Sequence, residues 1–304
     1  MTRLAAALVA VGFVVSAHPS PVRAAGAYQL VEHWGQLPAG TQWGVMSWVS
    51  VDAHDNVYAY QRDEPTSKVL VFDANGKFVR SWGDGQFPYP HSLRVLLDGF
   101  VWLTDRKSQQ LFKFTPEGKL LLSIGKKDVA GDNSSHDTFN GVSDVVMAPN
   151  GNIFVSDGEG GNTRVVKFTG DGTFIKTWGT KGSGPGQLSG PHCIAMDSGG
   201  RLYVCDRGNK RIQVFDQDGA YISEMAQFGT PVSIAFDSSD TIFVAAPAPE
   251  NKVTIGTTSG KVLETISGLD SAHGIAVDSH GNIYVAESAG KAVLKFTRGL
   301  AHER

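Results

Sequence analysis

The chain has 304 residues, of which 41% are hydrophobic and 10% aromatic, and its 27 basic and 30 acidic residues give a formal net charge of −3. This apolar content with so little net charge excludes an intrinsically disordered protein, and the lack of a basic excess disfavours nucleic-acid binding. Two cysteines are too few for a disulfide framework or a cysteine-based zinc site.

Residues 1–24 have the pattern of a secretory signal peptide. Arg3 supplies a positive charge near the start, residues 4–17 form an apolar run, and small residues precede a cleavage position after Ala24. A membrane anchor would need about 20 apolar residues, and this run is shorter, as is every later apolar segment. We therefore expect an exported protein, periplasmic or extracellular and without a membrane span, whose mature domain covers residues 25–304.

The rest of the chain repeats one all-β unit six times. Short strands with alternating apolar residues are separated by turn sequences, as in the fourth copy at residues 192–197, 201–206 and 211–216. The position that precedes each inner strand recurs after 44, 52, 49, 40 and 41 residues, which suits a four-stranded propeller blade of roughly 40–45 residues. These positions are residues 47, 91, 143, 192, 232 and 273.

The two ends of the chain predict a closed ring. The sixth unit stops at residues 296–298, one strand short of a full blade, whereas residues 28–35 form an outer strand that has no blade of its own. An open solenoid would not explain these complementary ends, and pairing them removes exposed strand edges. We therefore predict an all-β fold, a six-bladed β-propeller whose ring is closed by the N-terminal strand.

Three of the nine histidines occupy one repeat position on alternate blades. His91, His192 and His273 each stand immediately before the inner strand of the second, fourth and sixth units. The innermost strands line the central channel, so these positions lie about 120° apart around the axis. A single such histidine would be an ordinary strand-entry residue, but three on every second blade predict convergent imidazoles, which suit a catalytic Zn²⁺ with an open fourth position. The odd units have Ser47, Ser143 and Val232 there.

The repeats resemble NHL repeats, and the histidine pattern resembles that of the peptidyl-α-hydroxyglycine α-amidating lyases, over nearly all of the mature chain. The resemblance implies that the three histidines bind zinc. It also implies functional arginines at Arg62, which follows Tyr60-Gln61, and at Arg207, which follows Cys205-Asp206. A structural calcium ion of that family is held by backbone carbonyls whose counterparts here are those of Val49 and Leu93.

Two positions depart from the family pattern. The family's catalytic tyrosine follows Ser-Asp-Gly in the third blade, but here residues 156–158 are followed by Glu159, in a segment that is one residue longer. Glu159 is therefore the candidate base, unless it is a solvated loop carboxylate and Tyr60 or Tyr89 faces the channel instead. The family's calcium-binding aspartate is replaced by Gly274, so the resemblance supports zinc more strongly than calcium.

The resemblance implies a zinc-dependent lyase that cleaves the N–Cα bond of a peptidyl-α-hydroxyglycine, or a related N-acyl α-hydroxy compound, to an amide and glyoxylate. Arg62 would bind the carboxylate of this small-molecule or peptide C-terminal substrate, with Arg207 nearby, although either arginine could form an inter-blade salt bridge. The alternative is a non-catalytic exported NHL propeller that binds a protein or ligand. A lactonase-like hydrolase fits less well, because such propellers place Asp, Glu and Asn around calcium.

The sequence leaves two structural questions open. Cys193 and Cys205 lie roughly opposite each other on adjacent predicted strands, so they could form a disulfide or a free buried pair. The oligomeric state is not indicated by any pattern in the chain.

Overall fold

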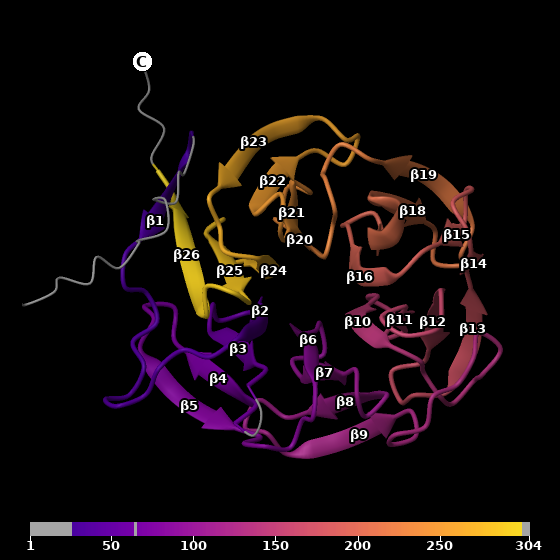
Figure 1. The fold of residues 1–304 in the computed structure, drawn as a ribbon, viewed down its shortest axis with the longest axis horizontal. Coiled ribbons are helices and arrows are strands. Elements are labelled where there is room, and N and C mark those ends of the chain that lie inside the picture. Colours follow the sequence, from indigo (N-terminus) through magenta and orange to yellow (C-terminus); the bar gives the residue numbers. More distant parts are fainter. Residues whose placement is uncertain (1–25, 64–65, 300–304) are drawn as a thin grey trace, which may run out of the picture.

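The protein is a ring of six four-stranded antiparallel sheets arranged around a central axis (Figure 1). The computed structural model describes residues 26–63 and 66–299, so the predicted signal peptide lies outside the described residues. The six sheets, called blades 1 to 6 here in chain order, confirm the predicted all-β six-bladed propeller.

From the axis outwards, blade 1 consists of β2 (Met46–Val51), β3 (Val57–Gln61), β4 (Lys68–Phe72) and β5 (Phe78–Trp82). Blade 2 consists of β6 (Pro90–Val95), β7 (Val101–Asp105), β8 (Gln110–Phe114) and β9 (Leu120–Ile124). Blade 3 consists of β10 (Val142–Met147), β11 (Ile153–Asp157), β12 (Arg164–Phe168) and β13 (Phe174–Trp178). Blade 4 consists of β16 (Pro191–Met196), β17 (Leu202–Asp206), β18 (Arg211–Phe215) and β19 (Tyr221–Met225). Blade 5 consists of β20 (Ser233–Phe236), β21 (Ile242–Ala246), β22 (Lys252–Gly256) and β23 (Val262–Ser267). Blade 6 consists of β24 (Ala272–Val277), β25 (Ile283–Glu287), β26 (Ala292–Arg298) and β1 (Tyr28–Val31).

Three short elements lie outside the blades. β14 (Thr180–Lys181) and β15 (Gln187–Leu188) pair in parallel, and η1 (Arg207–Asn209) is a single turn of 3₁₀ helix. No other helix occurs in the described ranges, and η1 is far too short to cross a bilayer.

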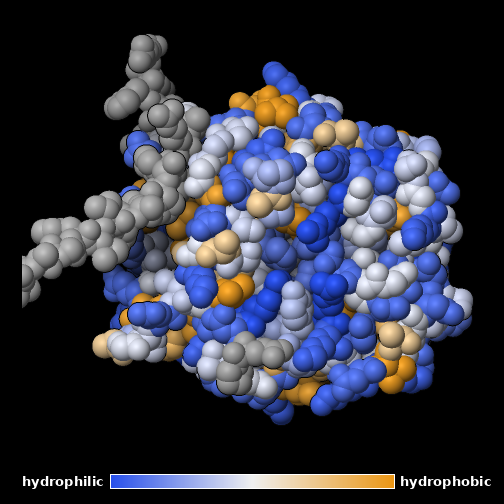
Figure 2. Space-filling model, viewed as in Figure 1, coloured by the Kyte–Doolittle hydropathy of each residue, from blue (hydrophilic) through white to orange (hydrophobic). Residues whose placement is uncertain are grey.

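The place of a strand within its blade decides how much of it is buried. The second strand of every blade is buried along its whole length, because both of its faces pack against neighbouring blades. The outermost strands instead leave side chains such as Val79 and Leu120 exposed. Hydrophilic residues gather around the centre of the face shown in Figure 2, where the channel opens.

The predicted closing strand is confirmed. β1 pairs antiparallel with β26, with Tyr28 opposite Arg298, and the two strands lie side by side in Figure 1. Just beyond β1, the buried ring of Trp34 lies 5.1 Å from the ring of Tyr284 in blade 6 and 5.6 Å from that of Phe72 in blade 1. The N-terminal segment therefore completes blade 6 and fastens it to blade 1.

Deletion of residues 27–35 is expected to lower the melting temperature by at least about 10 °C or to cause aggregation. The deletion leaves β26 as an unpaired edge and removes the aromatic contacts of Trp34, and exposed edges promote association between chains. Thermal unfolding and size-exclusion chromatography measure both effects, with Gln29→Ala, at an exposed site on β1, as the control. A monomeric deletion variant that melts like the wild type would contradict the closed ring.

Five of the six repeat positions 47, 91, 143, 192, 232 and 273 lie inside the inner strands, which corrects the expectation that each stands immediately before its strand. Only Val232 precedes its strand, β20, as expected. In five of the six blades the residue is the second of its strand, at a point where the register with the next strand shifts. Such a β-bulge redirects a side chain without ending the strand. The bulge therefore allows the histidines to turn to the channel while their neighbours stay packed in the blade.

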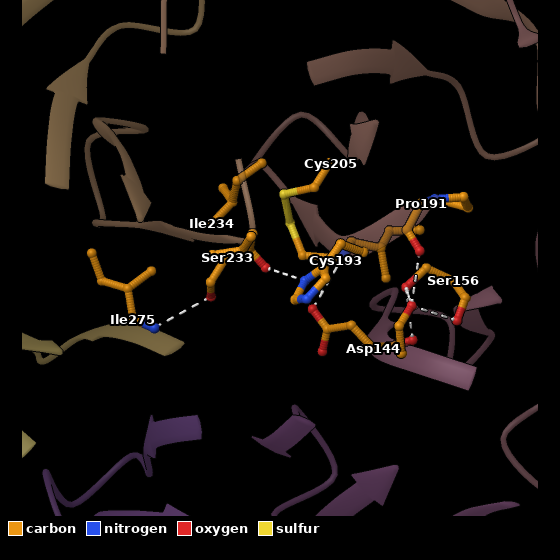
Figure 3. Close-up of a disulfide and its surroundings, with 12 residues drawn as sticks. Asp144, Ser156, Pro191, Cys193, Cys205, Ser233, Ile234 and Ile275 are labelled. Atoms are coloured by element: carbon orange, nitrogen blue, oxygen red, sulfur yellow. Dashed lines mark hydrogen bonds between the residues drawn. A yellow bond between two sulfur atoms is a disulfide. The ribbon is translucent and has the colours of Figure 1, made fainter. Parts of the chain in front are cut away.

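Cys193 and Cys205 form a disulfide, which answers one question that the sequence left open. Their Cα atoms are 4.9 Å apart, and Cys193 lies in the bulge at the start of β16, across from β17. In Figure 3 the disulfide lies in the space between the side chains of Ile234 of blade 5 and Asp144 of blade 3. The disulfide thus joins the two innermost strands of the blade that carries His192.

Candidate metal centre

Three histidine side chains meet at the centre of the ring. The ring centroid of His91 on β6 lies 4.7 Å from that of His192 on β16 and 5.5 Å from that of His273 on β24, and the last two are 5.0 Å apart. One potential ligand atom from each residue lies within 4.8 Å of the other two. The structure therefore brings together the three residues that the repeat alignment selected, and together they could hold a metal ion.

A backbone carbonyl of the next blade holds each imidazole. Each Nδ1 atom lies 2.7 Å from a carbonyl oxygen at the equivalent position of that blade: Ser143 for His91, Val232 for His192 and Ser47 for His273. A carbonyl oxygen only accepts, so Nδ1 carries the proton and donates it, which leaves the lone pair of Nε2 available to a metal. Nε2 of His192 is buried and has no hydrogen-bond partner among the residues that the structure describes.

Burial keeps the three imidazoles neutral. Burial is the main cause that puts the pKa of both His91 and His273 well below the usual value. Burial and the nearby Arg207 charge lower the pKa of His192 to about 3. All three side chains are therefore in the unprotonated form that binds metals at neutral pH.

The surroundings of the histidines fit a metal with an open coordination position. A bound ion would satisfy the buried Nε2 atom of His192, and three imidazole nitrogens suit transition metals. The fully buried Trp48 ring packs against all three rings, with centroids 6.1 Å from His91, 6.4 Å from His192 and 5.7 Å from His273. This indole closes one side of the centre, so a ligand would enter from the other side.

The carboxylate of Glu159 lies beside two of the histidines. Its Oε2 atom is 3.9 Å from Nε2 of His91, and its Oε1 atom is 4.0 Å from Nε2 of His192. The backbone N–H groups of Gly158 and Glu159 both donate to the carbonyl of Gly141, which anchors the loop after β11. With 12% of its side chain exposed, Glu159 is part of the centre and not a solvated loop carboxylate.

Two arginines bind that carboxylate. Nη1 of Arg106 donates to Oε2 of Glu159 at 3.3 Å, and Nη1 of Arg207 donates to Oε1 at 3.2 Å. Arg207 was predicted from the sequence as a site residue, whereas Arg106 was not. Arg106 directly follows the second strand of blade 2, as Arg62 does in blade 1 and Arg207 in blade 4, so aligning that position across the repeats would have found it.

Arg62 lies at the same mouth of the channel and keeps room for a ligand. Its Nε atom donates to the carbonyl of Pro90 at 2.8 Å, Nη2 to Oγ of Ser47 at 2.7 Å and Nη1 to the hydroxyl of Tyr89 at 3.4 Å. A guanidinium has five N–H groups, so two remain without a partner in the described part of the chain. Arg62 therefore bridges blades 1 and 2 and still presents donors.

Of the two tyrosines considered as alternative bases, Tyr60 and Tyr89, only Tyr89 lies at the site. The ring of Tyr89 lies 4.7 Å from the guanidinium of Arg62 and 5.6 Å from that of Arg106. Tyr60 is fully buried against Phe87, and burial raises its pKa far above the usual value. Tyr60 is therefore a core residue and does not face the channel.

The surroundings of Val49 and Leu93 do not fit the calcium ion that the resemblance implies. Both residues are fully buried on inner strands, but Gly274 offers no side-chain carboxylate in place of the family's aspartate. A side chain at this position would collide with the backbone, because a Cβ atom on Gly274 would lie 2.6 Å from Cα of Trp48.

Arg94 places a cationic group in this part of the channel. Its Nε and Nη2 atoms bind the two carboxylate oxygens of Asp144 at 3.0 and 2.6 Å, and both Nη atoms lie 3.4 Å from the carbonyl oxygen of Ile234. The guanidinium also lies 5.1 Å from the centre of the Trp48 ring. Arg94 of blade 2 thus contacts blades 1, 3 and 5 and links them.

The Arg94→Met variant is expected to lose about 3–5 kcal/mol of stability, because it leaves the carboxylate of the fully buried Asp144 without its charged partner. Added Ca²⁺ should not change the melting temperature of the wild type. Chemical denaturation measures the loss, with Lys126→Met, which removes an exposed ion pair with Asp137, as the control that should leave stability nearly unchanged. Stabilisation of the wild type by Ca²⁺ would show that the ion does bind.

The fold and the centre together define a six-bladed NHL-type propeller with a three-histidine candidate metal site at its axis. The NHL repeat family matches residues 188–215, and a family described as a beta-propeller repeat matches residues 255–286. The chain is 32% identical over 295 residues to NHL repeat-containing protein 3 of Homo sapiens, and the aligned region covers 88% of this chain and 84% of that protein. The chain belongs to this family of NHL repeat-containing proteins.

Relatives with a named activity are also similar to the chain. A probable peptidyl-alpha-hydroxyglycine alpha-amidating lyase of Caenorhabditis elegans is 25% identical over 244 residues, covering 75% of this chain and 69% of that protein. Among solved structures, a streptogramin B lyase superposes with a TM-score of 0.65 at 16% identity, covering 90% of this chain and 98% of the other. The second likeness concerns the fold alone.

Proposed function

We propose that this protein is a zinc-dependent lyase that cleaves the N–Cα bond of a peptidyl-α-hydroxyglycine, or a related N-acyl α-hydroxy compound, to an amide and glyoxylate. The observation that carries the proposal is the set of three neutral imidazoles with one carboxylate about 4 Å from two of their Nε2 atoms. The amidating lyase among the relatives supports it.

Zinc is the proposed metal because three histidine ligands with an open fourth position are typical of catalytic zinc sites. Bound Zn²⁺ would stabilise, as a Lewis acid, the negative charge that develops on the substrate hydroxyl oxygen. The hydrogen bonds from Nδ1 to the backbone carbonyls would keep the imidazoles of His91, His192 and His273 oriented for this role.

The remaining residues supply binding and proton transfer. Arg62 would bind the substrate carboxylate through its two remaining N–H groups and thereby orient the N–Cα bond. Glu159 would take the hydroxyl proton as the electron pair of the O–H bond forms the C=O bond of glyoxylate and the N–Cα bond breaks. The departing amide nitrogen then takes up this hydroxyl proton from Glu159, so the carboxylate ends the cycle unchanged.

Incubation of the zinc-loaded protein with α-hydroxyhippurate tests this activity. We expect benzamide and glyoxylate to be released in equal amounts, and release to stop when the zinc is removed. Protein that holds zinc but releases no glyoxylate, either from this compound or from peptides ending in α-hydroxyglycine, would overturn the lyase assignment.

The second candidate is a non-catalytic propeller that binds a protein or ligand on one rim. The identity of 32% to a protein named for its repeats alone favours it, but it gives no role to the free Nε2 atoms beside Glu159. Under either function we propose export to the periplasm or the extracellular space, as residues 1–24 predict. A mature N-terminus following Ala24, read by mass spectrometry, would support export.

A further inference from the structure

We infer that Arg106 is a positioning residue, which acts with Arg207 to hold the Glu159 carboxylate beside the metal ligands without letting it become one. The inference rests on the proposed function for its effect on turnover, whereas its effect on the metal centre can be measured without any substrate.

The contacts around Glu159 are arranged almost symmetrically. Oε2 accepts a hydrogen bond from Arg106 and faces His91, and both of these residues belong to blade 2. Oε1 accepts one from Arg207 and faces His192, and both belong to blade 4. Glu159 itself comes from blade 3, between the two. Each carboxylate oxygen therefore has one guanidinium and one imidazole around it, from the same neighbouring blade.

Such a carboxylate is close enough to become a ligand. Two ligands of a tetrahedral zinc ion with bonds of 2.0–2.1 Å are about 3.3 Å apart, whereas the Glu159 oxygens lie 3.9 and 4.0 Å from the histidine nitrogens. Movement of Glu159 toward the channel axis would bring one oxygen closer to that spacing, and an oxygen bound to the ion would fill the open position that the proposed reaction requires.

The two arginines oppose that movement. The side chains of Arg106 and Arg207 are 39% and 42% exposed, so their guanidinium groups lie at the mouth of the channel, on the solvent side of the carboxylate. Hydrogen bonds between guanidinium and carboxylate groups are among the stronger ones in proteins, and movement of Glu159 toward the ion would stretch both. The structure thus assigns to Arg106 the role of keeping Glu159 available as a base.

Cobalt(II) provides the test, because its visible spectrum reports coordination number and ligand type. In Arg106→Met protein loaded with Co²⁺ we expect a changed spectrum, and the dissociation constant for Zn²⁺ should fall by about 10-fold or more because Glu159 becomes an additional ligand. Turnover should fall by about 10–100-fold, with KM changing less than kcat. Arg106→Lys, which keeps the charge, should restore part of the wild-type spectrum and rate.

The decisive comparison uses the Glu159→Gln background. If Arg106 acts through Glu159, adding Arg106→Met to Glu159→Gln should change neither the Co²⁺ spectrum nor the Zn²⁺ affinity any further. Arg201→Met serves as the control, since Arg201 is also partly exposed and paired with a carboxylate, that of Asp197, in the turn between β16 and β17.

Two results would overturn the inference: a wild-type spectrum and Zn²⁺ affinity in Arg106→Met, or an equal change with and without the Glu159 carboxylate. A wild type that releases no glyoxylate would overturn the lyase function instead. The metal measurements would still decide the role of Arg106 in that case.

Discussion

The His192→Ala variant is expected to bind zinc at least about 100-fold more weakly than the wild type. A structural zinc site with four ligands contributes roughly 10–16 kcal/mol of binding free energy, so each ligand contributes about 3 kcal/mol. The variant retains two imidazoles, those of His91 and His273. The metal content after dialysis, measured by mass spectrometry, should fall from about one zinc ion per chain to nearly none.

The fold should survive this substitution, because the centre lies in the channel and not in the packed core of a blade. Circular dichroism and the melting temperature of the metal-free protein test this point. His280→Ala is the matched control, since His280 lies in a turn with 76% of its side chain exposed and should have no effect on zinc. A His192→Ala variant that keeps stoichiometric zinc would place the metal elsewhere.

The Glu159→Gln variant is expected to lower kcat by about 10²–10⁴ while zinc stays bound, the range typical of losing a general base. Glutamine has nearly the same shape but cannot take a proton from the substrate. It also presents one amide N–H₂ group where the carboxylate accepts hydrogen bonds from Arg106 or Arg207. Steady-state glyoxylate release, together with metal analysis of the same samples, separates loss of the base from loss of the metal.

Asp137→Asn is the control for this prediction, because Asp137 is an exposed carboxylate in an ion pair with Lys126 far from the centre. A fully active Glu159→Gln variant would show that another group takes the proton. Tyr89 would then be the next candidate, since it lies against Arg62 at the channel mouth, and Tyr89→Phe would be the variant to measure.

The ring and its closure could be predicted because both depend on repeated local patterns. Alternating strands, glycine turns and an N-terminal strand that matches the missing strand of the sixth unit specify the blades without knowledge of long-range contacts. The convergence of His91, His192 and His273 followed from the same repeat, because equivalent positions in a ring point to one axis. The exact position within the strand could not be predicted, since it depends on bulges that shift the register by one residue.

Other parts of the centre depend on contacts between blades, which sequence spacing does not report. The carboxylate of Glu159 reaches the histidines because the loop after β11 is anchored on Gly141, and a repeat alignment cannot give that direction. The position of Arg94 in the channel depends on Asp144 and Ile234 of other blades, which face its guanidinium. Likewise, only the register at the start of β16 decides that Cys193 meets Cys205.

The most direct test of the metal centre is a crystal structure of the zinc-loaded protein with diffraction data collected on both sides of the zinc absorption edge. We expect one anomalous peak at the channel axis, about 2.0–2.1 Å from Nε2 of His91, His192 and His273, with the Nδ1 atoms still hydrogen-bonded to the backbone carbonyls of the next blades. An anomalous peak bound to other residues, or no peak at the axis in protein that contains zinc, would contradict this expectation.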